Sequence, residues 1–509
     1  MNRITRALLL PLIVGGCASV QTSGPRPSGS AQAHTRAALT HAIDSMVGLA
    51  EFRTTNWGIL IVDPLASDTL YKLNATKLFI PASNQKLVSS SVILEQLGPD
   101  FRYRTVIAAR GAFAEQTLSG DLAVIGRGDP TASDHMKGDA MIPLRAIADS
   151  LWQRGVRHIT GSVVAMGNAF PGPVAGFGWS WDALDAASFA GVDELLFNEG
   201  LSTIRVRPGL KPGDPATLES KPARTYPTLR NEVTTTAPNT APATNGGRGG
   251  RGGRGGGMGT RVSAYHDTLT SAVVVRGQIA LGDSANVTIA QHDPDAAYVA
   301  ALTEALRDRG ITVDGRSSSP ESEHADSLFT IVSAPLREIL PVVLKPSQNQ
   351  IAEVFLRAIG LERTGIGTAD SGRRVIERQF TDWKIPSDGY VIRDGSGLSR
   401  NDLISPEAII GILDVMRRSP NFDLFYQSLP IAGIDGTIRT RMKGTAAEGN
   451  VHAKTGTLSM VRSLSGYVRT ADGLLLEFSV LCNNWLAPQA SVDRVADAIG
   501  VALAELRLR

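Results

Sequence analysis

The chain has 509 residues, of which 42% are hydrophobic and 20% charged, and its formal net charge at pH 7 is +2. This composition is typical of a globular protein rather than a disordered or fibrous one, and at roughly 150 residues per domain it allows about three domains. A charge balance so close to zero gives no reason to expect a nucleic acid partner.

Residues 1–16 have the layout of an export signal. Two arginines precede an apolar run over 7–14, and small residues lead to Cys17. The run is too short to span a bilayer as a helix. Val-Gly-Gly-Cys also resembles the bacterial lipobox, in which the cysteine becomes the lipidated first residue of the mature chain. We therefore expect an exported protein of the periplasm or cell envelope, with a polar tether over 17–31 and possible membrane attachment through a lipid on Cys17. The alternative is an ordinary signal peptide that happens to contain a cysteine.

The mature chain is predicted to begin with a helix and a hairpin. Apolar residues recur at helical spacing over 34–50, and two β-prone runs flank a Pro/Ala/Ser/Asp turn within 56–74. Such a hairpin leads directly into the next segment. This order predicts the start of a mixed α/β domain.

The segment 81–98, PASNQKLVSSSVILEQLG, predicts a largely buried helix with Ser83 in its first turn. Lys86 follows at the third position and lies on the same face of a helix. A serine becomes a good nucleophile when a base takes its proton, and a lysine with a depressed pKa can be that base. The ordinary interpretation is a helix start with a capping serine and a solvated lysine. The pair alone does not separate the two.

The stretch 102–325 has a different texture. Short β-prone runs, among them 105–109, 121–126 and 158–165, surround one helical segment at 142–154. We interpret the whole stretch as an inserted region of two small, mostly β modules.

The inner module is predicted over about residues 200–290 and contains a Gly/Arg-rich segment at 241–261. Repeated Arg-Gly-Gly resembles disordered segments that contact RNA, but an exported protein would not meet RNA, and glycine-rich runs do not order easily. We expect a flexible surface loop and no nucleic acid binding.

A second polar pair, Ser347 and Asn349, opens a predicted helix after a short helix over 335–344. Ser-x-Asn also occurs at Ser284 and Ser419, so the pattern has little meaning without its position. A serine after a proline at a helix entrance is most simply an N-cap. A hydroxyl and an amide two residues apart could equally face a cleft and relay a proton.

The third element is VHAKTGTL at 451–458, a predicted strand followed by two further β-type runs. Lys-Thr-Gly occurs once in the chain, at residues 454–456. Gly456 would let a ligand lie close against the strand edge, and Lys454 adds a cation for a carboxylate. The ordinary alternative is an exposed lysine at a strand end.

Ser-x-x-Lys, Ser-x-Asn and Lys-Thr-Gly, in this order, resemble the three motifs of the penicillin-binding proteins and serine β-lactamases. The long insertion between the first two motifs is similar to the three-domain D-alanyl-D-alanine carboxypeptidase/endopeptidases, the class C low-molecular-mass penicillin-binding proteins. The phrases that support the resemblance are GRGDPT (126–131), GWSWD (178–182), RDGSGLSR (393–400) and AKTGTL with SLSGYV (453–468).

The resemblance implies an α+β fold, with a transpeptidase/β-lactamase-like domain formed by residues 32–101 and 326–509. This domain has an antiparallel sheet flanked by helices, and the mostly β region 102–325 is inserted into it. The implied substrate is a peptidoglycan peptide. β-Lactam antibiotics are implied as covalent inhibitors, and no cofactor is implied.

The implied reaction forms an acyl-enzyme on Ser83, which attacks the carbonyl of the penultimate D-alanine. Lys86 is the expected proton acceptor. Ser347 would pass a proton to the leaving amine, with Asn349 and Lys86 holding it in place. Water then releases the acyl group.

The resemblance also implies binding roles at the third motif. Lys454 and Thr455 would bind the terminal carboxylate, or the carboxylate of penicillin, beside Gly456. The backbone N–H groups of Ser83 and Thr457 would form the oxyanion hole.

Relatives that select a diaminopimelate-like amino end often carry an acid after a tryptophan pair, which here leaves a choice between Asp182 and Asp185. Both could also be plain surface acids. The eight histidines show no paired ligand spacing, so we expect no metal in catalysis.

Two other function classes stay open at this point. A serine β-lactamase would need fast deacylation, for which the sequence shows no dedicated base. A wall-binding lipoprotein could keep the fold without activity, although the complete set of polar residues argues against this.

Overall fold

The computed structural model describes most of the chain. The predicted signal 1–16, the tether 17–31, Cys17 and all but the last residues of the segment 241–261 lie outside the described residues. The described residues are 35–238, 259–267, 269–270, 272–315 and 324–509. None of the helices in these ranges is long and apolar enough to cross a membrane.

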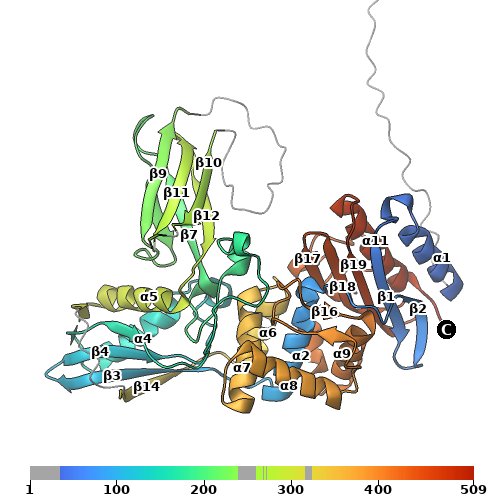
Figure 1. Cartoon of the computed structure of the whole chain (residues 1–509), viewed down its shortest axis with the longest axis horizontal. Helices are drawn as coiled ribbons and strands as arrows, with labels where there is room; N and C mark the ends of the chain where they lie inside the picture. The colour runs from blue at the N-terminus through green and yellow to red at the C-terminus, as the bar shows by residue number, and fades with distance from the viewer. Residues whose placement is uncertain (1–34, 239–258, 268, 271, 316–323) are drawn as a thin grey trace, which may run out of the picture.

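A five-stranded antiparallel sheet combines the N-terminal hairpin with three strands near the C-terminus, in the order β17-β18-β19-β1-β2. The N-terminal hairpin pairs with the last strand, with Trp57 opposite Cys482. Figure 1 shows these blue and red segments side by side. The strands are β1 (Asn56–Asp63), β2 (Asp68–Leu73), β17 (His452–Leu458), β18 (Val461–Arg469) and β19 (Leu475–Asn483).

Helices cover both faces of this sheet. Because neighbouring side chains in a strand point to opposite faces, Ile59 and Ile61 pack in one hydrophobic cluster and Leu60 in the other. The first cluster includes residues of α1 (Arg36–Val47) and α11 (Gln489–Glu505). The second includes residues of α2 (Gln85–Leu97), α6 (Leu336–Leu344), α7 (Asn349–Thr364), α8 (Ala369–Asp382), α9 (Pro406–Arg418) and α10 (Phe422–Ser428).

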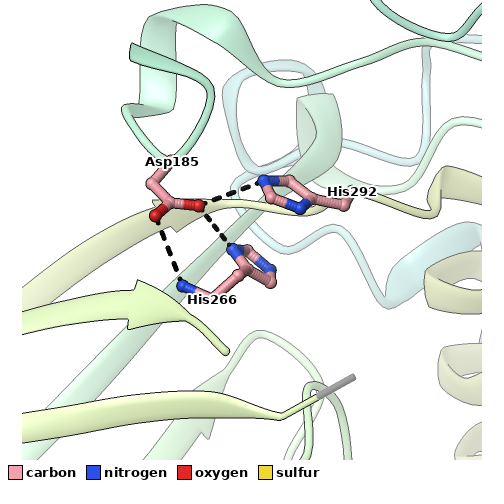
Figure 2. A group of neighbouring side chains, drawn as sticks. All are labelled: Asp185, His266 and His292. Carbon is pink, nitrogen blue, oxygen red and sulfur yellow. Dashed lines mark hydrogen bonds and ion pairs between the residues drawn. The ribbon is translucent and has the colours of Figure 1, made fainter. Parts of the chain in front are cut away.

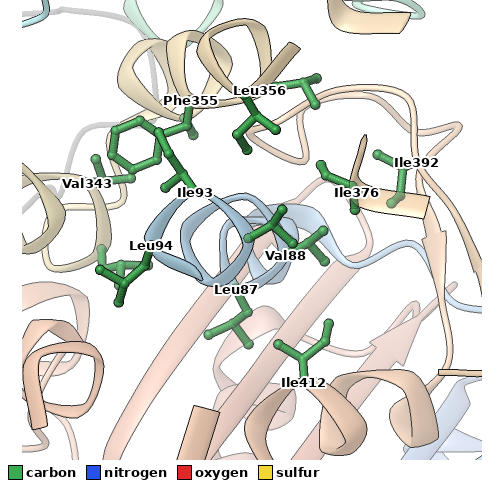
Figure 3. Close-up of a cluster of buried hydrophobic side chains, with 14 of the residues drawn as sticks. Leu87, Val88, Ile93, Leu94, Val343, Phe355, Leu356, Ile376, Ile392 and Ile412 are labelled. Carbon is green, nitrogen blue, oxygen red and sulfur yellow. The ribbon is translucent and has the colours of Figure 1, made fainter. Parts of the chain in front are cut away.

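Helix α2 lies at the centre of the second cluster. Its apolar residues from Leu87 to Leu94 are fully buried, and Figure 3 shows them surrounded by Val343 of α6, Phe355 of α7, Ile376 of α8 and Ile412 of α9. Burying one such side chain contributes about 1.5–3 kcal/mol. This packing holds the start of α2 firmly against the edge of the five-stranded sheet. A short ladder of β15 (Tyr390–Val391) and β16 (Leu403–Ile404) lies nearby.

The stretch between the first two motifs forms three further sheets. A six-stranded sheet packs on α4 (Ile142–Gln153) and α5 (Pro294–Arg309) through one hydrophobic cluster. Its strands are β3 (Arg104–Ala114), β4 (Thr117–Ile125), β5 (His158–Ile159), β6 (Val163–Ala165), β13 (Thr312–Val313) and β14 (Asp326–Val332). A short helix, α3 (Asp134–Lys137), follows β4.

Two three-stranded sheets share the fourth hydrophobic cluster, whose buried members lie between Ile204 and Ile289. They form the green part of Figure 1, away from the five-stranded sheet. One contains β7 (Leu201–Arg207), β8 (Thr217–Lys221) and β12 (Ala285–Ala290), and the other β9 (Leu229–Thr236), β10 (Arg261–His266) and β11 (Val273–Ala280).

The domain boundaries stay a prediction. The pairing of β14 with β3, with Val332 opposite Arg104, leads us to propose that the inserted region ends after β14 rather than at residue 325. The segment 158–165, predicted as one strand, forms the two strands β5 and β6. Gly161 lies between them at a position without room for a side chain, since a Cβ there would lie 2.2 Å from Asp121 Oδ1.

Candidate active site

Ser83 lies in η2 (Ala82–Asn84), a short 3₁₀ turn that continues into α2. It therefore precedes the α-helix rather than lying within its first turn. Ala82 has φ of 47°, a left-handed conformation that is costly for a residue other than glycine. Gly397 fits against it, since a Cβ at Gly397 would lie 1.9 Å from Ala82 O. Packing thus holds the turn that presents Ser83.

Lys86 is fully buried and contacts three oxygen atoms. Its Nζ lies 3.0 Å from Ser83 Oγ, 2.7 Å from Asn349 Oδ1 and 2.7 Å from the Ser396 carbonyl oxygen. The first partner is a hydroxyl, and the other two are carbonyl oxygens that can only accept. The structure therefore places the predicted Ser-Lys pair in direct contact and brings Asn349 to the same amine.

Burial lowers the pKa of Lys86 from its ordinary value to about 7. The negative charges of Asp394, Glu353 and Asp402 act in the opposite direction, but the loss of solvation outweighs them. A substantial fraction of Lys86 is consequently neutral near pH 7. A neutral amine has two N–H donors and one lone pair. With both donors given to the two carbonyl oxygens, the lone pair faces the Ser83 hydroxyl.

Ser347 is held in a left-handed conformation, with φ of 66°. It does not cap the following helix, because Gln348 is the N-cap of α7 and its side chain accepts a hydrogen bond from Ile351 N. The Ser347 hydroxyl instead accepts a hydrogen bond of 2.8 Å from Lys454 Nζ. A serine in a strained backbone conformation, with its hydroxyl turned toward a buried amine, is typical of a functional site.

Asn349 connects Lys86 to the loop that follows the tryptophan pair. Its Oδ1 accepts from Lys86, and its Nδ2 donates to the Ser188 carbonyl oxygen at 2.9 Å. Ser188 belongs to η4 (Ala187–Phe189). Gln350 also donates to carbonyl oxygens of this segment. The position of η4 is thus coupled to the amide that touches Lys86.

Lys454 extends from β17 into the same buried region and is fully buried. Burial and the nearby charge of Lys86 lower the pKa of Lys454 well below its usual range. Its Nζ donates to Ser347 Oγ and, at 2.9 Å, to the Thr455 carbonyl oxygen. Asn84 Nδ2 donates to the Lys454 carbonyl oxygen at 2.8 Å, which ties η2 to β17. The third motif therefore lies directly beside the first.

At position 456 glycine is needed for packing within the protein, whereas the sequence suggested only that it leaves room for a ligand. A Cβ at this position would lie 2.1 Å from Ser463 Oγ and 2.5 Å from the Pro81 carbonyl oxygen. The missing side chain thus lets β17 pack against the turn that carries Ser83. That Cβ would also lie 3.0 Å from Ser83 N, which places the two expected oxyanion-hole segments next to each other. Thr457 follows on β17, opposite Arg462 of β18.

The side chain of Thr455 shares a hydrogen bond of 2.7 Å with Thr437 Oγ1. Thr437 lies in η6 (Gly436–Ile438), a segment that sequence reasoning did not select. Because either hydroxyl can donate, one of the two can turn its proton toward a bound anion. No sequence pattern indicates a role for Thr437, because its contact with Thr455 forms only in the folded chain.

The two candidate acids after the tryptophan pair lie in different environments. Asp182 is in η3 (Trp181–Ala183) and is exposed; among the described residues, the structure does not bring it into contact with the Ser83 site. Asp185 bonds to His266 and His292, as Figure 2 shows. A role for Asp182 in selecting substrates stays a prediction.

Sequence reasoning also missed the acids behind Lys86. Glu353 accepts hydrogen bonds from the backbone N–H groups of Gly395 and Ser396, and Asp394 accepts from Trp179 Nε1 at 2.9 Å. Burial raises the pKa of Glu353 to about 7. The phrases 178–182 and 393–400 supplied Trp179 and Asp394 as resemblance, but nothing in the sequence placed them behind Lys86.

Known proteins resemble this chain over most of its length. The profile of the D-Ala-D-Ala carboxypeptidase 3 (S13) family matches residues 39–506. A D-alanyl-D-alanine carboxypeptidase from an Actinomadura species is 32% identical, covering 88% of this chain and 81% of that protein. A Dictyostelium discoideum protein named penicillin-sensitive carboxypeptidase A is 26% identical, covering 89% of this chain and 88% of that protein.

The crystal structure of penicillin-binding protein 4 from Haemophilus influenzae has the same fold, with a TM-score of 0.75 at 22% identity, covering 91% of this chain and 99% of that one. This confirms the expected penicillin-binding, β-lactamase-like architecture. The family profile covers nearly all of the described residues, and it agrees with the resemblance based on the three motifs. The chain therefore belongs to the D-Ala-D-Ala carboxypeptidase 3 (S13) family.

Proposed function

We propose that the protein removes the terminal D-alanine from peptidoglycan peptides through an acyl-enzyme on Ser83. One contact supports this reaction above all. The Ser83 hydroxyl lies 3.0 Å from Lys86 Nζ, in an environment that lowers the pKa of this amine to about 7. A base with a pKa near the working pH is well suited to general base catalysis.

In the acylation step, the Ser83 proton moves to Lys86 Nζ while Oγ bonds to the carbonyl carbon of the penultimate D-alanine. The backbone N–H groups of Ser83 and Thr457 stabilise the resulting oxyanion, and single donors of this kind typically contribute about 3–4 kcal/mol. The peptide C–N bond then breaks. The departing amine takes a proton from Ser347 Oγ, and Lys454 can replace this proton through their 2.8 Å hydrogen bond. Water then attacks the acyl ester, its hydroxyl bonds to the carbonyl carbon, and a proton returns to Ser83 Oγ as the acid leaves.

The terminal carboxylate binds at the start of β17. Lys454 supplies the cation, and the Thr455 hydroxyl, shared with Thr437, supplies a neutral donor. A bound carboxylate also stabilises the protonated form of Lys454, whose pKa is low while the amine is buried without an anion. β-Lactams carry a carboxylate that can occupy the same position, and this supports their action as covalent inhibitors.

Labelling with a fluorescent penicillin tests the nucleophile. The wild-type protein is expected to carry the label after denaturing electrophoresis, and Ser83→Ala is expected to lose it. The control is Ser459→Ala, which removes an exposed hydroxyl beyond the end of β17. Labelling of Ser83→Ala at the wild-type rate would exclude Ser83 as the nucleophile. Circular dichroism establishes that both variants are folded.

Two assays distinguish the activities that this site could support. Mass spectrometry of digested muropeptides separates loss of a terminal D-alanine from cleavage of cross-links, so it reports carboxypeptidase and endopeptidase activity separately. Nitrocefin hydrolysis over many turnovers would instead indicate a β-lactamase. A folded protein with none of these activities would be a wall-binding protein of the same fold.

We also propose that the protein works in the cell envelope, where peptidoglycan lies. Residues 1–16 would direct export, and a lipid on Cys17 would attach the mature chain to the membrane. Cell fractionation and metabolic labelling with a fatty acid test this in the native host. Cys17→Ser is expected to abolish lipid incorporation and release the protein from the membrane fraction. If fractionation does not change, the anchor is not at Cys17.

A further inference from the structure

Three metal-ligating side chains meet outside the Ser83 site. Asp185 lies in the loop between η3 and η4, His266 is the last residue of β10, and His292 follows β12. Figure 2 shows both imidazole rings turned toward the same carboxylate. The three residues are far apart in the chain, so the histidine spacing in the sequence does not reveal the cluster.

The ligand atoms of the cluster are close enough to share one ion. Asp185 Oδ1 lies 2.8 Å from His266 Nδ1 and 3.1 Å from His292 Nε2. One ligand atom from each residue lies within 4.8 Å of the other two. In a tetrahedral site with bonds of about 2.0–2.1 Å, neighbouring ligand atoms are separated by roughly 3.3 Å. The cluster therefore needs only small side-chain movements to surround an ion.

The surrounding backbone holds the carboxylate in place. Ala290 N donates to the Asp185 carbonyl oxygen at 3.1 Å, and His266 N donates to Asp185 Oδ2 at 3.3 Å. The second carboxylate oxygen is thereby occupied, and Oδ1 faces the two rings. Supporting contacts of this kind orient metal ligands and are a regular part of metal sites.

The two rings are stacked, with centroids 3.7 Å apart and planes inclined by 18°. The stacking brings both rings to the same side of the carboxylate, and neutral imidazole is the form that binds a metal ion.

We propose that Asp185, His266 and His292 bind a divalent transition-metal ion, and that zinc is the ion that fits best. Two imidazole nitrogens and one carboxylate oxygen are a ligand set that zinc accepts, with a water in the fourth position. Water can reach the site because the side chains of Asp185 and His292 are 40% and 47% exposed.

The bound ion would fasten the loop beside the Ser83 site to the ends of β10 and β12, which carry His266 and His292. Asp185 precedes η4, which contacts both α7 and β12. Within η4, the Ser188 carbonyl oxygen accepts the hydrogen bond from Asn349 Nδ2. Metal binding is therefore expected to restrict this loop. The site itself does not depend on the proposed reaction at Ser83, because its ligands take no part in that reaction.

Zinc titration of the full chain, without a polyhistidine tag and in competition with a chromophoric chelator, tests the proposal. The wild-type protein is expected to bind one equivalent. His292→Ala and Asp185→Asn should each weaken binding at least tenfold. The matched control is His158→Ala, which breaks a similar histidine–carboxylate contact to Asp314 and should leave the affinity unchanged.

Thermal unfolding and limited proteolysis provide readouts independent of the titration. Zinc is expected to raise the melting temperature of the wild type and to slow cleavage of the loop around residue 185, whereas magnesium should do neither. If Asp185→Asn fails to fold, the exposed His292 still provides the test. The proposal is overturned if the wild type binds no stoichiometric zinc, or if His292→Ala binds it as tightly as the wild type does.

Discussion

The pH dependence of acylation gives the sharpest test of the role of Lys86. Only the neutral amine can accept the Ser83 proton, and burial lowers its pKa to about 7. The neutral fraction therefore rises with pH. With this pKa, about one site in eleven is neutral at pH 6 and about ten in eleven at pH 8, so the rate should increase roughly tenfold over this interval. A lysine with an ordinary pKa would still be protonated at pH 8.

The assay is stopped-flow acylation by a fluorescent penicillin, with the second-order rate constant measured from pH 5.5 to 9. This constant reports groups of the free enzyme. The expected profile approaches a slope of tenfold per pH unit below about pH 6, bends near pH 7 and levels off above pH 8. A rate constant that stays flat across the range, or falls as the pH rises, would refute neutral Lys86 as the base.

A variant separates Lys86 from other titrating groups. The charge of Glu353 raises the pKa of Lys86, so Glu353→Gln should lower this pKa further and move the midpoint of the profile to lower pH. Glutamine keeps an acceptor oxygen for the backbone N–H groups of Gly395 and Ser396. A midpoint that moves to higher pH in this variant would show that the titrating group is not Lys86.

Three further predictions concern the surroundings of the nucleophile. Lys454→Gln removes the proposed partner of the substrate carboxylate and should lower kcat/KM for a D-alanyl-D-alanine peptide roughly thirtyfold, which corresponds to about 2 kcal/mol of lost transition-state stabilisation. Equal losses for the peptide and for its C-terminal amide would contradict carboxylate binding. Gly456→Ala places a methyl group 2.1 Å from Ser463 Oγ and should slow penicillin labelling and lower stability by about 1–3 kcal/mol, as measured by denaturant unfolding. Trp179→Phe removes the 2.9 Å hydrogen bond to Asp394 and should lower the free energy of unfolding by about 1.5–3 kcal/mol, measured by denaturant unfolding. A change within experimental error would show that this hydrogen bond contributes little to stability.

The sequence was most informative where local pattern decides structure. Helical spacing predicted α2, which is buried over most of its length, and β-type runs predicted β1, β17, β18 and β19. The three motifs predicted the family and, through it, the fold. The predicted ends of helices were less accurate. For example, the helix expected over 34–50 is observed over Arg36–Val47. Helix ends depend on capping and packing, which periodicity does not report.

Local pattern could not predict the residues that act through contacts distant in the chain. Nothing in the local sequence distinguishes Glu353 and Asp394 from other acidic residues. Only the fold brings them close enough to Lys86 for their charges to act on its pKa. For Ser347 the sequence left an N-cap as the ordinary alternative to a role in the site, and only the fold separates the two: Gln348 caps the helix, and the Ser347 hydroxyl accepts a hydrogen bond from Lys454.

The amino-acid sequence alone thus determined which segments become helices and strands and which functional groups the chain carries, since both follow from residue type and spacing. Only the tertiary structure decided the pKa of Lys86, because desolvation depends on burial by distant segments. It also decided that Asp185, His266 and His292 meet, because their contact depends on how a loop packs against the ends of two strands, and no local interaction specifies that.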